Sequence, residues 1–206
     1  MIEFNKVPNI LDINLNQIEA VIFDMDGTLL NSEVLHAKAL LELIGNNGDE
    51  QQLLKDFVGV AEPSVYETLL KRNIIPQISF DEFIDLKNKC FKDILKNKDV
   101  SSKLLDKDLF QLIKKFKDRG LKVALVTASE RGTTDIFMNE LNLLEYFDII
   151  LTRNDTEKSK PDPMPYQRSF ELLDIEPHQA LIFEDSKTGL ESAMRSEANV
   201  CKVSWY

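Results

Sequence analysis

Short apolar runs alternate with stretches of helical periodicity along most of the chain. Runs rich in β-branched and aromatic residues are typical of buried strands, and they cover 20–23, 122–127, 147–151, 180–183 and 200–203. Apolar residues at helical spacing predict helices over 108–119, 131–141, 163–173 and 187–198. Strands that alternate with helices indicate βαβ units. The pattern therefore predicts an α/β fold with a mainly parallel sheet covered on both faces.

One block departs from this alternation, between the first strand and the second. Its apolar spacing predicts only helices, over 33–46, 51–58, 63–72 and, after a capping box at Ser79 and Glu82, 80–98. The expected buried stripe of the last helix includes Phe83, Leu86 and Phe91. The block is too long for a single crossover helix. We therefore expect residues 31–106 to form an inserted helical domain, and 1–30 with 107–206 to form the sheet domain.

Turn-forming residues mark the ends of several predicted elements. Gly120 lies where a C-terminal helix cap belongs, and Asn46, Asn47 and Gly48 break the first helix of the helical block. Asn199, which tolerates a left-handed conformation, is expected to end the helix that begins at residue 187.

Net charge, cysteine spacing and the distribution of apolar residues exclude several classes of protein. The 206 residues are 43% hydrophobic and carry a formal net charge of −10, which argues against a general nucleic-acid binder. Cys90 and Cys201 lie far apart and are expected to be free thiols. No signal-peptide pattern or long apolar window is present, so we expect a cytoplasmic protein with no membrane contact. Monomer is the default expectation for its assembly.

Carboxylate, hydroxyl and lysine side chains follow four of the predicted strands. Asp24-Met25-Asp26-Gly27-Thr28 ends the first strand, Thr127-Ala128-Ser129 ends the second, and Glu184-Asp185-Ser186 ends the fourth. The loop after the third strand holds Lys158-Ser159-Lys160-Pro161-Asp162-Pro163. Parallel strands deliver their carboxyl ends to one edge of the sheet, which is where ligands bind in this class of fold.

Carboxylates that converge at such an edge repel one another unless a cation lies among them. Asp24, Asp26, Glu184 and Asp185 offer only oxygen ligands, which favours Mg2+. A lysine and a hydroxyl beside Mg2+ form a phosphate site. One aspartate can then attack phosphorus, while a second moves the proton.

These motifs, in this order, resemble the haloacid dehalogenase-like hydrolase superfamily. The motifs are D-M-D-G-T, T-A-S, K-P-D-P and E-D-S, and the resemblance extends over residues 20–203. Asn31-Ser32-Glu33 and His36 further resemble the subgroup of phosphatases and beta-phosphoglucomutases with a helical cap. The resemblance implies a three-layer, Rossmann-like parallel-sheet core with an inserted helical cap domain.

The resemblance also implies a role for each residue. Asp24 would be the nucleophile and a metal ligand, and Asp26 the general acid/base, whose backbone carbonyl also binds the metal. Asp185 would be a direct metal ligand, and Glu184 a ligand either directly or through water. Lys160 would neutralise the transferring phosphoryl group and Thr127 would hydrogen-bond it. The expected substrate-binding residues are Thr127, Ala128, Lys160 and His36.

Several nearby residues have two readings. Ser129 and Ser186 either orient a neighbour or cap the following helix. His36 either hydrogen-bonds near Asp26 or is structural. Asp162 is expected to cap the helix that opens at Pro163. In addition, Lys158 and Arg131 are expected to be surface residues.

The predicted function is a Mg2+-dependent phosphatase that acts on a small phosphorylated metabolite, of the sugar phosphate or phosphoglycolate type, through an aspartyl phosphate. Asp26 argues against dehalogenation, because dehalogenases of the superfamily lack that aspartate. The alternative is a beta-phosphoglucomutase-like phosphomutase. It is disfavoured because Val58 and Glu62 stand around Gly59 where mutases carry a lysine and an arginine. A more remote alternative is a catalytically silent regulatory or binding protein.

Overall fold

The computed structural model describes two compact units, and their residues are 2–3, 15–45, 49–57, 60, 62–105 and 107–203. Unit 1 comprises Met1–Asn31, Leu105–Arg131 and Asn142–Tyr206. Unit 2 comprises Ser32–Leu104 and Gly132–Leu141. The expected break at Asn46–Gly48, the residues Val58 and Gly59, and the predicted boundary at residue 106 lie outside the described residues.

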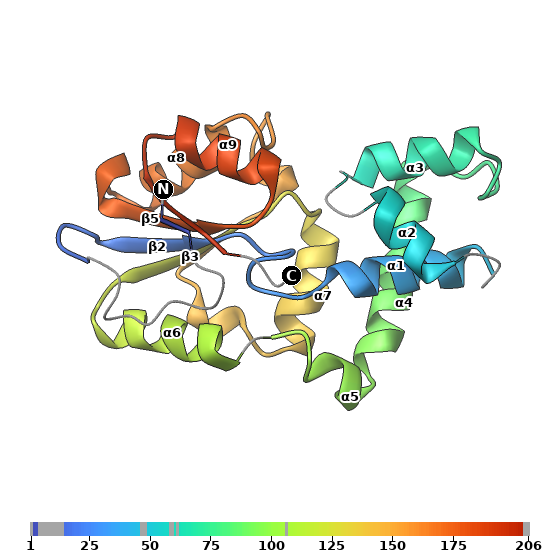
Figure 1. Cartoon of the computed structure of the whole chain (residues 1–206), viewed down its shortest axis with the longest axis horizontal. Coiled ribbons are helices and arrows are strands. Elements are labelled where there is room, and N and C mark those ends of the chain that lie inside the picture. Colours follow the sequence, from blue (N-terminus) through green and yellow to red (C-terminus); the bar gives the residue numbers. More distant parts are fainter. Residues whose placement is uncertain are drawn as a thin grey trace. The chain divides into compact units, whose positions relative to one another are not determined.

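Unit 1 is built on a six-stranded parallel sheet with the strand order β1-β6-β5-β2-β3-β4 (Figure 1). The strands are β1 Ile2–Glu3, β2 Ala20–Phe23, β3 Lys122–Val126, β4 Ile149–Leu151, β5 Ala180–Glu184 and β6 Asn199–Lys202. The helices of unit 1 are α6 Lys107–Asp118, α8 Met164–Leu173 and α9 Lys187–Arg195. The last turn of α6 is followed by Gly120, whose φ of 78° is the expected left-handed cap.

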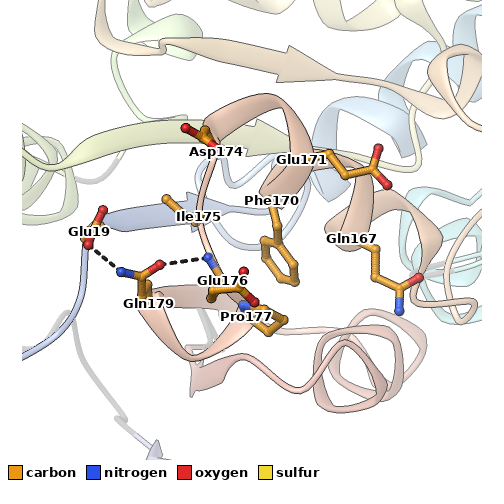
Figure 2. Close-up of a pocket in the computed structure, with 9 residues that line it drawn as sticks. All are labelled: Glu19, Gln167, Phe170, Glu171, Asp174, Ile175, Glu176, Pro177 and Gln179. Atoms are coloured by element: carbon orange, nitrogen blue, oxygen red, sulfur yellow. Dashed lines mark hydrogen bonds between the residues drawn. The ribbon is translucent and has the colours of Figure 1, made fainter.

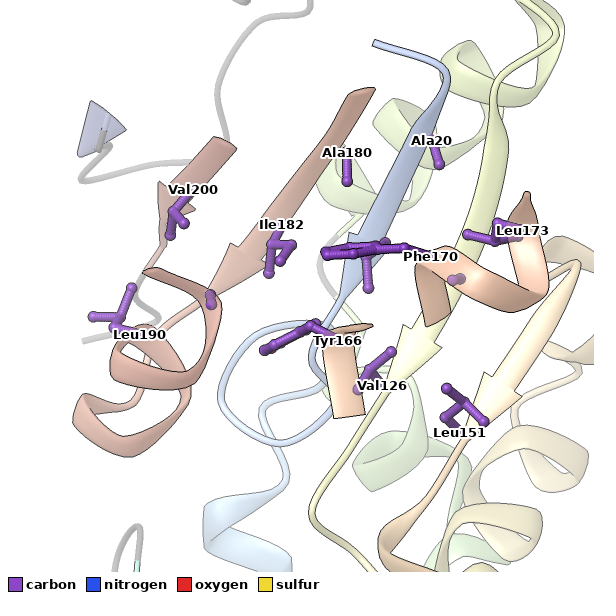
Figure 3. Close-up of a cluster of buried hydrophobic side chains, with 13 residues drawn as sticks. Ala20, Val126, Leu151, Tyr166, Phe170, Leu173, Ala180, Ile182, Leu190 and Val200 are labelled. Atoms are coloured by element: carbon purple, nitrogen blue, oxygen red, sulfur yellow. The ribbon is translucent and has the colours of Figure 1, made fainter. Parts of the chain in front are cut away.

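Side chains alternate between the two faces of β2, and each face packs against its own helices. Phe23 stacks on Phe183 with ring centroids 4.7 Å apart, and both rings contact Phe116 of α6. Ala20 and Ile22 point to the other face, into a cluster that α8 and α9 cover (Figure 3). These two covered faces confirm the predicted three-layer, Rossmann-like α/β fold with an inserted helical domain.

Two element boundaries in unit 1 differ from the prediction by more than one residue. The third predicted strand begins at Ile149 rather than Phe147, because Asp148 turns its carboxylate to the backbone N–H of Val123 at 2.7 Å. The last helix ends at Arg195, three residues earlier than predicted. Glu197, with φ of 66°, takes the left-handed conformation, and Asn199 begins β6 instead of capping the helix. The two-residue strand β1 had not been predicted.

Unit 2 is helical. Its helices are α1 Glu33–Leu43, α2 Glu50–Phe57, α3 Glu62–Lys71, α4 Phe80–Leu95, α5 Lys98–Ser101 and α7 Arg131–Glu140, whose first residue belongs to unit 1. Ser79 caps α4 by accepting the N–H of Glu82 at 3.1 Å. The helix ends three residues before the predicted end, and Asn97 caps the separate helix α5. The boundaries of the inserted domain remain a prediction.

The buried face of α4 matches the prediction at Phe83 and Phe91 but not at Leu86. The buried residues are Phe83, Lys87, Phe91 and Leu95, whereas Leu86 is 40% exposed. The four buried positions recur every fourth residue, which is one stripe of an α-helix. A lysine therefore occupies the stripe where the sequence pattern had placed a leucine.

Both cysteines are free, as predicted. Cys201 is buried in β6, and burial raises the pKa of its thiol to about 12. Cys90 is half-buried, and its pKa is raised to about 11 by burial and by the nearby Glu42. Among the described helices, none combines the length and the apolar character that a membrane crossing needs.

Candidate active site

Three neighbouring strands of unit 1 end side by side in the middle of the sheet. In the register of the sheet, Phe23 of β2 pairs with Phe183 of β5 and with Leu125 of β3. The next residue after Phe23 is Asp24, whose N–H donates to the carbonyl of Phe183 at 3.0 Å. Asp24 therefore follows the central strand, with Glu184 and Thr127 at the ends of the strands on either side.

Lys160 joins the two acidic strand ends. Its Nζ lies 2.6 Å from Asp24 Oδ1 and 2.6 Å from Glu184 Oε1, and it also donates to the carbonyl of Val126 at 2.9 Å. All three charged side chains are at least nine-tenths buried. Three acceptors thus fix the ammonium group in one place.

Burial and charge act together on this cluster. Burial raises the pKa of Asp24 well above its usual range, and the nearby Glu184 and Asp185 raise it further, while Lys160 acts in the opposite direction. Burial alone would lower the pKa of Lys160, but the two adjacent carboxylates raise it. Lys160 therefore stays charged, and its single positive charge is shared by more than one carboxylate.

Glu184 is held by five hydrogen-bond donors. Oε1 accepts from Lys160 and, at 2.9 Å, from the hydroxyl of Tyr166, which lies with its ring under the lysine. Oε2 accepts from the N–H of Asp185 at 3.0 Å and from the N–H and hydroxyl of Ser186, both at 3.2 Å. Gly189 makes room for this carboxylate, because a Cβ there would overlap it. Sequence reasoning missed Tyr166, since an aromatic residue on the same buried helix face as Phe170 and Leu173 is typical of core packing.

Asp185 completes a group of three carboxylates. One oxygen each from Asp24, Glu184 and Asp185 lie within 4.8 Å of one another. Thr28 orients Asp185 by donating to Oδ1 at 2.8 Å. Gly27, with φ of 80°, is required here because a side chain would collide with the same carboxylate.

This group fits a hard divalent cation. All its ligand atoms are carboxylate oxygens. Burial, and to a smaller extent the neighbouring Glu184 and Asp185, raise the pKa of Asp24, and a cation among these carboxylates would offset both effects. The fourth predicted carboxylate, Asp26, is not in this three-residue group. Its Oδ2 accepts from the hydroxyl of Ser129 at 2.6 Å.

The residues after β3 lie at the same edge. Thr127 is buried, and its hydroxyl oxygen accepts the N–H of Ser129 at 3.0 Å. Ala128, between them, is exposed. The edge thus places an exposed backbone segment one strand away from Asp24, where the sequence had predicted substrate binding.

The structure separates several of the alternative readings. Lys158 is exposed and pairs with Asp162 at 3.4 Å, whereas Lys160 is the buried lysine. Asp162 accepts the N–H of Met164 at 3.0 Å, so it caps α8 as expected. Ser186 caps α9 through the N–H of Gly189 and also holds Glu184, so both of its readings apply. Arg131 binds Asp155 at 2.5 Å and is partly exposed.

His36 lies in unit 2, within a buried polar cluster of α1, α3 and α4. Its Nδ1 is 3.1 Å from Glu62 Oε1 and 3.1 Å from Lys87 Nζ, and Lys87 also donates directly to Glu62. The Lys87 side chain is only 3% exposed. Although burial would raise the pKa of Glu62, Lys87 and His36 lower it to about 2. Sequence reasoning missed Lys87 because its partner lies 25 residues away.

A separate pocket of about 620 Å³ lies at the opposite edge of the sheet (Figure 2). Glu19 and Gln179, which precede β2 and β5, line it together with Glu171, Asp174 and Glu176. None of the residues at the carboxyl ends of the strands lines it. Its acidic rim, with no lysine or arginine among the lining residues that the structure describes, would repel phosphate, whereas the Asp24 edge holds Lys160.

Both the sequence and the fold of this chain have known relatives. Pyrophosphatase PpaX of Bacillus cereus is 29% identical over 191 residues, which are 92% of this chain and 84% of that protein. The structure of CbbY from Rhodobacter sphaeroides in complex with phosphate superposes with a TM-score of 0.77 at 22% identity, over 92% of this chain and 87% of that one. Beta-phosphoglucomutase from Clostridium difficile gives a TM-score of 0.70 at 22% identity, over 89% and 83%.

At such identities the two solved structures establish the fold alone. The family follows from a sequence model for haloacid dehalogenase-like hydrolase, which matches residues 21–203 and so includes the four motifs at the strand ends. The resemblance noted from those motifs is confirmed: the chain belongs to the haloacid dehalogenase-like hydrolases, a family of enzymes.

Proposed function

We propose that the protein is a Mg2+-dependent phosphatase that hydrolyses small phosphate monoesters through a phosphoaspartate on Asp24. The observation that carries this proposal is the buried set of Asp24, Lys160 and Glu184, with both Lys160 contacts at 2.6 Å. It combines a carboxylate nucleophile with a fixed cation beside it. Asp185 supplies a further carboxylate for the metal.

The first half of the reaction forms the phosphoaspartate. An oxygen of Asp24 attacks phosphorus, and the bond from phosphorus to the ester oxygen breaks. Asp26 gives its proton to that leaving oxygen, so the product departs as an alcohol. Lys160 offsets the negative charge of the phosphoryl oxygens, and Thr127 and Ala128 are proposed to hold them.

The second half returns the enzyme to its starting state. Water attacks the phosphorus of the phosphoaspartate and gives a proton to the Asp26 carboxylate. The bond from phosphorus to Asp24 then breaks, which releases phosphate and restores both carboxyl groups. One acidic group therefore serves as acid in the first half and as base in the second.

Mg2+, when bound, would offset charge on the phosphoryl group and on Asp24. Asp24, Asp185 and the backbone carbonyl of Asp26 are the proposed ligands. Both oxygens of Glu184 are already engaged by donors, two on Oε1 and three on Oε2. This favours a contact of Glu184 with the ion through water.

The charge balance of unit 2 favours a phosphatase over a phosphomutase. A mutase must hold a second phosphate, for which cationic side chains are needed. The buried lysine of the His36, Glu62 and Lys87 cluster is paired with Glu62, whose pKa of about 2 keeps it anionic at neutral pH. This cluster therefore offers little net positive charge to a second phosphate.

Pyrophosphate is a second candidate substrate. The relative at 29% identity is called a pyrophosphatase, and a phosphoanhydride presents the same phosphoryl group with a better leaving group. The same Asp24 chemistry would apply to it. Cytoplasmic location, a monomeric state and the role of His36 in substrate binding stay predictions.

The test is hydrolysis of p-nitrophenyl phosphate with Mg2+ and with EDTA. We expect activity that EDTA abolishes, and a loss of at least about 1,000-fold in Asp24→Asn. Asp174→Asn, at the opposite edge of the sheet, is the matched control and should retain activity. Activity that ignores EDTA and survives Asp24→Asn would reject the mechanism.

A panel of phosphorylated metabolites, with pyrophosphate among them, then ranks the substrates. Conversion of beta-glucose 1-phosphate to glucose 6-phosphate, dependent on glucose 1,6-bisphosphate, would favour the mutase instead. Wild-type protein that hydrolyses no member of the panel would favour the silent binding protein.

A further inference from the structure

Ser129 lies at the edge of the sheet where the carboxyl ends of the strands meet, and the mechanism above gives its side chain no role. It is 9% exposed, and its hydroxyl donates to Asp26 Oδ2 at 2.6 Å. This distance is within the range of an O–H···O hydrogen bond. The alternative role for Ser129 is to cap the helix α7. At the start of α7, the N–H of Arg131 donates to Asn154 Oδ1 at 2.7 Å, whereas the Ser129 hydroxyl donates to Asp26.

The backbone of Ser129 is anchored on both sides. Its N–H donates to Thr127 Oγ1 at 3.0 Å, and its carbonyl accepts the N–H of Arg153 at 3.0 Å. Thr127 is itself tied to β4, because its N–H donates to the carbonyl of Leu151 at 2.9 Å. The Ser129 hydroxyl therefore projects from a fixed point of the sheet.

The backbone around Asp26 is fixed as well. The N–H of Gly27 donates to the carbonyl of Leu30, and the N–H of Leu30 donates to the carbonyl of Met25, both at 2.8 Å. These bonds close a tight turn after β2. The motion that remains for Asp26 is rotation of its own side chain, and the bond from Ser129 restrains that rotation.

We propose that Ser129 is a positioning residue for Asp26 in the proposed phosphatase reaction, on which this inference rests. The hydroxyl does so by donating to Oδ2 of the Asp26 carboxyl group. It also holds the carboxyl group in one orientation toward the ester oxygen. Loss of the hydroxyl should therefore harm proton transfer to the leaving group and leave the attack by Asp24 intact.

The test compares two aryl phosphates of similar shape. p-Nitrophenolate leaves readily without a proton, whereas phenolate is a poor leaving group and needs one. The value of kcat/KM is measured for both, because it reports the steps up to phosphoaspartate formation. We expect Ser129→Ala to lose about tenfold more kcat/KM with phenyl phosphate than with p-nitrophenyl phosphate.

Two further variants separate positioning from structure. Ser129→Thr keeps the hydroxyl and should restore phenyl phosphate hydrolysis to within about threefold of wild type. Ser196→Ala removes another buried hydroxyl of unit 1, which bonds to the carbonyl of Ala193 at 2.7 Å, and should leave the ratio of the two substrates unchanged. Retained p-nitrophenyl phosphate activity shows that Ser129→Ala is folded.

In Ser129→Ala that retains measurable p-nitrophenyl phosphate activity and is therefore folded, an equal partial loss on both substrates would overturn the positioning role, while wild-type hydrolysis would still support the proposed function. A misfolded Ser129→Ala would lose activity on both substrates entirely, and the test then uses Ser129→Thr. In that variant, an unchanged ratio of the two kcat/KM values supports the role of Ser129. A tenfold lower relative kcat/KM with phenyl phosphate refutes it. Wild-type protein without Mg2+-dependent activity on either aryl phosphate would remove both proposals.

Discussion

The buried ion pair of unit 2 makes a quantitative prediction. Glu62→Gln keeps the shape of the side chain and removes its charge, which leaves Lys87 buried without its carboxylate partner. The pKa of Glu62 falls from 4.5 to about 2 in the folded protein. At about 1.4 kcal/mol per pKa unit, the ionised carboxylate contributes about 3 kcal/mol to the free energy of unfolding.

The sign of the pH dependence follows from the same shift. A carboxyl group with a depressed pKa stabilises the folded state above its unfolded pKa, and this stability is lost as the pH falls. The difference between wild type and Glu62→Gln should therefore be about 3 kcal/mol at pH 7. It should shrink as the pH falls from 4.5 toward 2, where Glu62 becomes protonated.

Urea denaturation followed by circular dichroism measures this difference. Hydrogen exchange of the amides of α4 at pH 7 assigns the loss to unit 2. The matched control is Glu67→Gln on the same helix, whose carboxylate is 63% exposed and pairs with the exposed Lys71. That change should cost less than about 1 kcal/mol. Equal losses in the two variants, or a Glu62→Gln difference that does not vary with pH, would refute the reasoning.

Three further outcomes are expected in unit 1. Tyr166→Phe removes one donor to buried Glu184 and should lower the free energy of unfolding by about 1–3 kcal/mol in urea denaturation. Gly189→Ala, usually stabilising in a helix, should destabilise instead because its Cβ meets the Glu184 carboxylate; an unchanged melting temperature would contradict this. Mg2+ should raise the wild-type melting temperature reversibly with EDTA, and Asp185→Asn should reduce that rise; an equal rise in both would remove Asp185 from the metal site.

Much of unit 1 follows from its sequence because the relevant signals are local. The run Ala20–Phe23 and the polar residues after it are contiguous, and parallel pairing brings such strand ends together without further information. The resemblance to the family is visible in the same contiguous motifs, and the family model that matches residues 21–203 includes them. By contrast, β1 is two residues long, which is too short for any periodic pattern.

The contacts that the sequence did not reveal join residues that lie far apart along the chain. The buried charge of Lys87 is offset by Glu62, and His36 Nδ1 lies 3.1 Å from its ammonium group; no pattern within α4 distinguishes this lysine from a surface lysine. The hydroxyl of Tyr166 is a functional contact only because Glu184 lies opposite it, 18 residues later. Similarly, Asp148 bonds to Val123 of a neighbouring strand, and the predicted strand begins only after it, at Ile149.

The thiol of Cys201 has a practical consequence. Cys201 of β6 pairs with Ile2 of β1 on one side and with Phe183 of β5 on the other. Its pKa of about 12 leaves about one molecule in ten thousand as thiolate at pH 8. A thiol-directed reagent can modify it only when this border of the sheet separates from its neighbours. The rate at which Cys201 is labelled thus measures how often β6 separates from the sheet, next to the strand that ends in Glu184.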